Sequence, residues 1–89
     1  MFTEPGYYVL FGNRRLCFPD FSSAFSALRL AFAVLDEKFF YDSKICADCI
    51  ERLGYFDIAS EVFQLKFRIA RVKSSKDAVE YLSGFSCLK

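Results

Sequence analysis

The sequence contains no histidine and no tryptophan, and it has a single methionine among 89 residues. Histidine is the most common general base in enzymes and the most common protein ligand of metals. Its absence excludes a serine–histidine–aspartate triad and any metal site that depends on imidazole. The four glycines also lie too far apart to form a phosphate-binding loop. We therefore expect no enzymatic activity and no cofactor.

A long hydrophobic segment is absent as well. The longest uninterrupted apolar run covers residues 30–35, whereas a helix needs about 20 apolar residues to cross a bilayer. Near the amino terminus, Glu4, Pro5 and Gly6 stand where a secretory signal would have basic residues followed by an apolar stretch. These features predict a cytoplasmic protein without membrane contact. Its cysteines are then expected to be reduced thiols, at positions Cys17, Cys46, Cys49 and Cys87.

Aromatic residues, by contrast, are abundant. Phenylalanine occurs 12 times and tyrosine five times, in a chain that is 54% hydrophobic. A chain this short forms one domain, which we place at residues 1–89. Bulky aromatic side chains let so small a domain bury enough apolar surface to fold. Core filling is therefore the favoured explanation of the aromatic excess, and an exposed aromatic patch for binding is the alternative.

Local patterns predict most of the secondary structure. Two strand-like runs flank a Gly-Asn pair, which is a typical two-residue connection, so a β-hairpin is expected over about 7–18. Phenylalanines and leucines then recur every three or four residues, which predicts a helix over about 20–38. Further helices are expected over about 43–53, where Gly54 suits a carboxyl-terminal cap, and over about 75–83.

Residues 57–72 fit two patterns. Ile58, Leu65 and Ile69 belong to an apolar seam with the period of a helix, whereas Phe67 and Ile69 belong to an alternating series with the period of a strand. Length favours the helix, because this segment is much longer than the usual strand of about five or six residues. The predicted fold is therefore a mostly helical α+β domain, in which the hairpin packs on four helices around a phenylalanine-rich core. The alternative is a third strand within this segment, which would give a three-stranded sheet covered by helices.

Cys46 and Cys49 have the spacing of many zinc sites and redox motifs. A structural zinc site usually takes its ligands from two such pairs, but Cys17 and Cys87 are isolated in the sequence. Both closely spaced thiols fall on the apolar face of the helix predicted over 43–53. We expect them to pack in the core and to bind no metal. Zinc binding and dithiol redox chemistry are the alternatives.

The net charge is only +1, but it is unevenly distributed. Basic side chains concentrate in residues 66–76, where five of them occur with no acidic residue before Lys76. The sequence pI is 7.6, whereas strong nucleic-acid binders typically have a pI above about 9. This segment is therefore interpreted as a solvated face or as a contact for an acidic protein, with nucleic acid as the alternative.

A small domain without catalytic groups is best explained as a binding module. We expect a regulator or inhibitor that docks on a larger intracellular complex, of the kind that phages and mobile elements encode; this last step is an association with chain size. The partner is expected to be a protein with an acidic surface, and a nucleic acid or a second copy of the chain is the alternative. The residues expected to contact it carry bidentate or amide donors: Arg14, Arg15, Gln64, Arg68 and Arg71.

Overall fold

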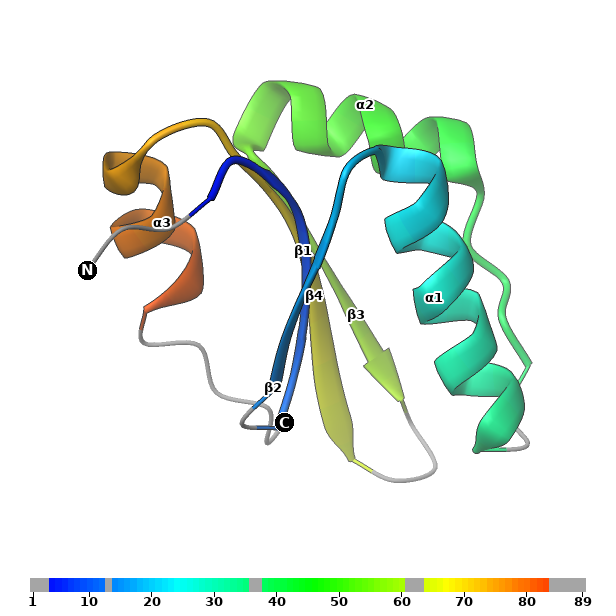
Figure 1. The fold of residues 1–89 in the computed structure, drawn as a ribbon. Helices are drawn as coiled ribbons and strands as arrows, with labels where there is room; N and C mark the ends of the chain where they lie inside the picture. Colours follow the sequence, from blue (N-terminus) through cyan, green and yellow to red (C-terminus); the bar gives the residue numbers. More distant parts are fainter. Residues whose placement is uncertain (1–3, 13, 36–37, 61–63, 84–89) are drawn as a thin grey trace.

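The computed structural model describes residues 4–12, 14–35, 38–60 and 64–83. Within these residues the chain forms four strands and three helices in the order ββααββα (Figure 1). The strands form one antiparallel sheet in the order β2-β1-β4-β3. The bounds of the elements are β1 Gly6–Phe11, β2 Arg14–Phe18, α1 Phe21–Val34, α2 Ser43–Leu53, β3 Tyr55–Ser60, β4 Leu65–Val72 and α3 Ser75–Leu82.

Two hairpins meet at the centre of this sheet. The first hairpin consists of β1 and β2, and the second consists of β3 and β4. In the central pair, Val9 of β1 lies opposite Ile69 of β4, and on its other side Val9 lies opposite Leu16 of β2. Strands β2 and β3 are therefore the edges of the sheet.

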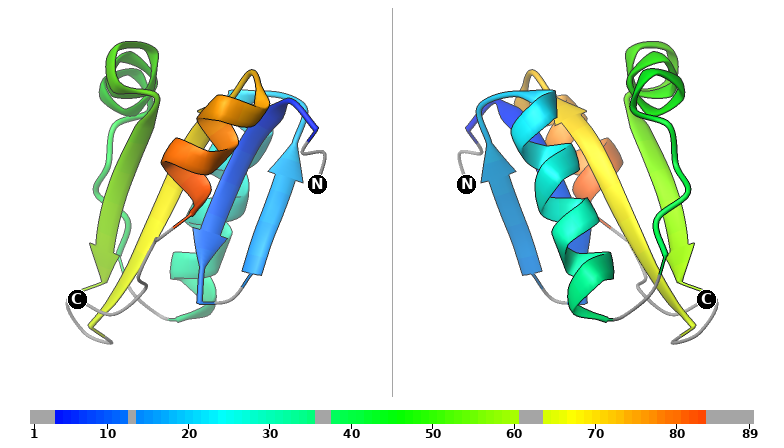
Figure 2. Two further views of the ribbon diagram at one scale, coloured as in Figure 1. Left: turned by 90° about the vertical axis from the view of Figure 1, so that its left-hand side faces the viewer. Right: turned by 90° about the vertical axis from the view of Figure 1, so that its right-hand side faces the viewer.

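The helices cover the two faces of the sheet differently. Helices α1 and α2 lie against one face, and the short helix α3 lies against the other (Figures 1 and 2). Because side chains alternate along a strand, Val9, Phe67 and Ile69 point toward α1 and α2, whereas Leu10 and Ala70 point toward α3. The central strands are consequently buried from both sides.

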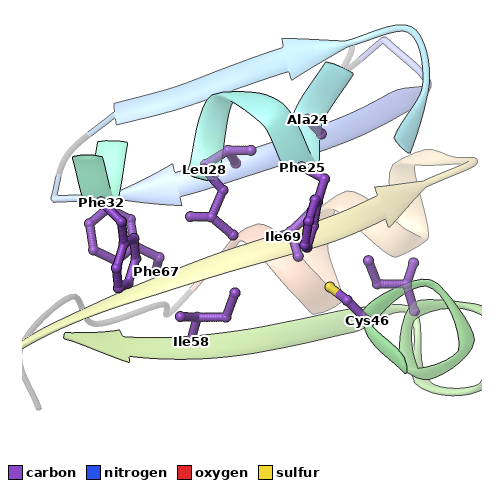
Figure 3. Packing of buried hydrophobic residues seen from close by; sticks show 10 residues of the cluster. Ala24, Phe25, Leu28, Phe32, Cys46, Ile58, Phe67 and Ile69 are labelled. Carbon is purple, nitrogen blue, oxygen red and sulfur yellow. The ribbon is translucent and has the colours of Figure 1, made fainter. Parts of the chain in front are cut away.

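The larger core lies between the sheet and helices α1 and α2 (Figure 3). The rings of Phe32 and Phe67 meet at its centre, with their centroids 5.2 Å apart. Phe25 and Cys46 are buried in the same cluster. Core filling thus accounts for these phenylalanines, whereas Phe40 is largely exposed. A smaller core under α3 consists of Tyr8, Leu10, Ala70, Val72, Ala78 and Leu82.

Short polar side chains begin all three helices. Asp20, Asp42 and Ser74 each accept a hydrogen bond from a backbone N–H in the first turn of the helix that follows. Gly54 ends α2 in the left-handed conformation, with φ of 92°. A Cβ atom at this position would also collide with the ring of Tyr81, so glycine is required here for two reasons.

The helix predicted over 57–72 is wrong, because this segment contributes to β3 and contains all of β4. The two-residue period of a strand is weak there because β4 is an interior strand that is buried on both faces. The alternation holds from Leu65 to Ile69 and breaks at the apolar pair Ile69-Ala70, so the apolar residues also fit a helical seam. The fold predicted as mostly helical is likewise wrong, since the sheet has four strands and the alternative prediction gave it three.

The remaining predicted elements are present with changed bounds. The hairpin expected over 7–18 forms β1 and β2, and the helices expected over 43–53 and 75–83 correspond to α2 and α3. The helix expected over 20–38 ends at Val34, and residues 36–37 lie outside the described part of the chain. Among the described residues, no helix has the length and apolar character that crossing a membrane requires.

Candidate functional site

Strand β2 has an open edge within the described part of the chain. All five of its residues pair with β1, and no described strand pairs with its other side. Four of the five are exposed, including Leu16, which keeps 40% of its surface accessible. An open strand edge presents N–H and C=O groups that can pair with a strand of another molecule.

The apolar surface of helix α1 extends beyond the part that the other described residues cover. Its core-facing stripe contains Ala24, Phe25, Leu28 and Phe32, all of which are buried. The only charged residue among its 14 is Arg29, which lies over the ring of Phe25 at 5.6 Å. Its exposed polar stripe consists of Ser22, Ser26 and Arg29, and an amphipathic helix normally exposes only such a polar face.

A second apolar stripe runs along α1 beside the first. It consists of Ala27, Leu30, Ala31 and Val34, which follow the three- and four-residue spacing of one helix face. Leu30 is 64% exposed and Val34 is 77% exposed. These residues were not among those predicted from the sequence. Their three- and four-residue spacing, in a segment with a single charged residue, was the sequence signal for a second apolar face.

This second stripe and strand β2 border an apolar groove, which we call the α1–β2 groove. Its volume is about 450 Å³, and every side chain that lines it is apolar. The first hairpin contributes Val9, Phe11 and Leu16 to the lining, and β4 contributes Leu65 and Phe67. The remaining lining residues lie on or directly after α1: Ala27, Leu30, Ala31, Val34 and Leu35. Sites for small molecules usually combine an apolar lining with a few polar groups that orient the ligand. Because the lining has no polar side chain, the groove suits the apolar side chains of a protein better.

The arginines of β2 lie next to this groove and point to different faces of the sheet. Arg14 lies opposite Phe11, which packs on the α1 side, whereas Arg15 lies opposite Leu10, which packs under α3. Both side chains are exposed. They supply positive charge at one end of the open edge.

The side chain of Arg68 is held by contacts within the domain. Its Nε and Nη2 atoms donate hydrogen bonds to the two carboxylate oxygens of Asp57 at 2.6 and 2.9 Å, and Nη1 donates to the carbonyl oxygen of Tyr81 at 3.1 Å. The guanidinium also lies 4.3 Å from the centre of the Tyr55 ring. The hydrogen bond to Asp57 raises the pKa of Arg68 above its usual value. Arg68 therefore joins β4, β3 and α3.

Arg71 and Gln64 lie apart from the arginines of β2. Arg71 lies opposite Tyr7, at the other end of β1 from the Phe11–Arg14 pair, and its guanidinium is 5.9 Å from the Tyr7 ring. Gln64 lies in the turn before β4 and has a positive φ of 56°. Arg14 and Arg15 are neighbours in the sequence, but they point to opposite faces of the sheet. The five predicted residues therefore do not form one surface.

The two closely spaced cysteines have different surroundings on α2. Cys46 is fully buried in the larger core, and this burial raises the pKa of its thiol to about 12. Cys49 is half-buried, and its thiol donates to the carbonyl oxygen of Tyr55 at 3.7 Å. No group of three or more potential metal-ligating residues occurs within the described ranges.

We predict that Cys17 reacts rapidly with iodoacetamide in the folded protein, whereas Cys46 does not. The thiolate is the reactive form, so a thiol with a pKa of about 12 remains neutral as the pH rises from 7 to 10. Cys17 is exposed on β2 and is open to the reagent. Peptide mass spectrometry after short labelling times would show which of the two cysteines is labelled first. Labelling of Cys46 as fast as Cys17 at pH 8 would contradict its burial in the core.

None of the protein families, curated proteins or solved structures compared with this chain matches it. Its functional interpretation therefore rests on the geometry of the described residues.

Proposed function

We propose that this chain is a non-catalytic protein-binding module and that the α1–β2 groove is its docking surface. The observation that carries the proposal is the exposure of Leu30 and Val34 beside Leu16 and the open edge of β2. Single exposed apolar residues are common on protein surfaces, but a continuous apolar groove is typical of an interaction site. A partner would gain free energy by covering the groove and by pairing with the strand edge.

The charge near the groove indicates which side chains of a partner would surround its apolar contact. Residues 14–35 contain three arginines and one acidic residue, Asp20. Arg14 and Arg15 at the open edge would favour acidic groups that flank the apolar contact. The partner is therefore expected to carry at least one acidic group beside its apolar contact, next to two of the five predicted residues.

A protein partner agrees better with these contacts than a nucleic acid does. Phosphate binding needs a broad surface of one charge. Alternation along β4 puts Arg68 and Arg71 on opposite faces of the sheet, and Arg68 is bound to Asp57. The lining of the groove carries no charge at all.

The proposal predicts that the double substitution Leu30→Glu and Val34→Glu removes partner binding while the fold remains intact. Two carboxylates would have to be buried without partners in the interface, which costs several kcal/mol. Tagged protein would be purified from its native host after mild cross-linking, and bound polypeptides would be identified by mass spectrometry. Circular dichroism would verify the fold.

The matched control is the double substitution Ile45→Glu and Val79→Glu. These residues are similarly exposed, at 66% and 69%, but they lie on α2 and α3 outside the groove. We expect the control to retain the bound polypeptide. Equal binding by both double variants, or recovery of nucleic acid as the only bound species, would contradict the proposal.

A further inference from the structure

We infer that the partner in the α1–β2 groove is a second copy of this chain, with β2 of each copy paired antiparallel about a twofold axis. This inference rests on the proposed function, because it names the partner of the same surface. The two four-stranded sheets would join into one continuous sheet. The second apolar stripes of the two α1 helices would then face each other above the joined strands.

The open edge of β2 and the second stripe of α1 lie side by side and need to be covered together. β2 can accept a strand along its open edge, and Leu30 and Val34 need an apolar surface beside that strand. A single peptide strand added to β2 would satisfy the backbone and leave much of the α1 stripe uncovered. A second copy presents a strand and an apolar helix in the same spatial relation, so it covers both features at once.

The distribution of charge along β2 also favours a second copy. The strand begins with Arg14 and Arg15 and is followed by Asp20, with Leu16 at its centre. Antiparallel pairing centred on Leu16 brings Arg14 of each copy, which lies on the α1 face of the sheet, toward Asp20 of the second copy. Parallel pairing would place arginine beside arginine. The antiparallel arrangement thus allows two Arg14–Asp20 pairs between the copies, and Arg15 stays on the opposite face of the sheet.

Asp20 is suited to this role because it carries its charge at an exposed position. Its carboxylate accepts the backbone N–H of Ser23 at 2.8 Å, and this hydrogen bond lowers the pKa of Asp20 below its usual value. The carboxylate keeps further acceptor capacity while it caps α1. An arginine that approaches from a second copy can therefore bind to it without breaking the cap.

The composition of the second stripe of α1 suits contact between two identical helices. Ala27 and Ala31 alternate with Leu30 and Val34, so small residues lie between larger ones. Such a surface allows the larger residues of one helix to pack over the alanines of its neighbour. In the twofold arrangement the two α1 helices run antiparallel, which also gives favourable alignment of their dipoles.

Sedimentation equilibrium of the purified wild-type chain tests whether the dimer exists. We expect a species of twice the 10.3 kDa chain mass at high concentration. The double substitution Leu30→Glu and Val34→Glu should weaken this dimer by at least about 100-fold, because it buries two carboxylates per copy in the apolar contact between the α1 helices. The double substitution Ile45→Glu and Val79→Glu should leave the dissociation constant unchanged.

A cysteine at position 16 tests the register independently of affinity. Residues directly opposite in an antiparallel pair have Cα atoms about 4.5–5.5 Å apart, which is within the range for a disulfide. In a Cys17→Ser background, Leu16→Cys should therefore form a covalent dimer upon mild oxidation with diamide. Val79→Cys in the same background provides the control and should remain monomeric under the same conditions.

The outcomes separate this inference from the proposed function. A wild-type chain that remains monomeric at about 1 mM, beyond the range of specific association, would overturn the dimer. So would a dimer that is unaffected by Leu30→Glu with Val34→Glu, or equal cross-linking of the two cysteine variants. If the chain is monomeric and the same double substitution still removes a different bound polypeptide, the groove remains a docking surface and only the identity of its partner is wrong.

Discussion

Replacing Phe67 with alanine is expected to lower the free energy of unfolding by about 3–5 kcal/mol, the usual range for a phenylalanine removed from a core. Phe67 is 2% exposed, and its ring packs against those of Phe32 and Phe11, with centroid distances of 5.2 and 5.6 Å. The loss is large relative to the total stability of about 5–15 kcal/mol for a typical domain. Urea denaturation followed by circular dichroism would measure it.

The neighbouring residue provides the control for this prediction. Lys66 lies next to Phe67 on β4 and points to the other face, so Lys66→Ala is expected to cost less than about 1 kcal/mol. The contrast is also a test of the fold. The helical interpretation of residues 57–72 left Phe67 outside its apolar seam, whereas the strand makes Phe67 central. A small effect of Phe67→Ala would contradict the strand.

Replacing Arg68 with alanine is expected to lower the free energy of unfolding by about 2–3 kcal/mol, because it removes a charge-assisted fork and a ring contact together. The side chain is only 16% exposed, so solvent does little to screen its pair with Asp57. Loss of the hydrogen bond to the Tyr81 carbonyl should also release the end of α3. Thermal denaturation would measure the stability, and amide hydrogen exchange in α3 would measure this release.

A second arginine–aspartate pair supplies a matched control. Arg52 and Asp48 are 3.2 Å apart on the surface of α2, and both side chains are largely exposed. Exposed pairs of this type contribute less than about 1 kcal/mol, so Arg52→Ala should have a small effect. Arg68→Lys should recover only part of the loss, because lysine keeps the charge but not the planar fork. Similar costs for Arg68→Ala and Arg52→Ala would show that the buried network is unimportant.

The local parts of this fold could be predicted from the sequence. A Gly-Asn pair between apolar runs was enough to predict the first hairpin, and helix periodicity was enough to predict the regions of α1, α2 and α3. The carboxyl-terminal cap at Gly54 could also be predicted, because a cap depends only on its own helix end.

The non-local parts could not be predicted in the same way. β4 takes its position from pairing with β1, about 60 residues earlier in the chain, and no local pattern encodes that pairing. Its two faces are covered by different helices, so both Ile69 and Ala70 are apolar and the alternation of apolar and polar residues breaks there. Tertiary contacts therefore decided between two patterns that fitted the sequence equally well.

The same limitation applies to the candidate site. The five residues chosen from the sequence shared a donor chemistry, but strand register decides which face each one occupies. It separates Arg14 from Arg15 and Arg68 from Arg71. The roles of Leu30 and Val34 depend on which side of α1 the sheet covers, and that side is set by the packing of the whole domain. Only the structure identifies them as exposed.

Photo-cross-linking from position 30 in the native host is the most direct test of the α1–β2 groove as a docking surface. Benzoylphenylalanine would replace Leu30 in one variant and Val79 in the other, two exposed apolar residues on opposite sides of the sheet. We predict a discrete protein adduct from position 30, whose mass equals two chains if the partner is a second copy, and none from position 79. Absence of an adduct at position 30, or equal adducts at both positions, would contradict the account.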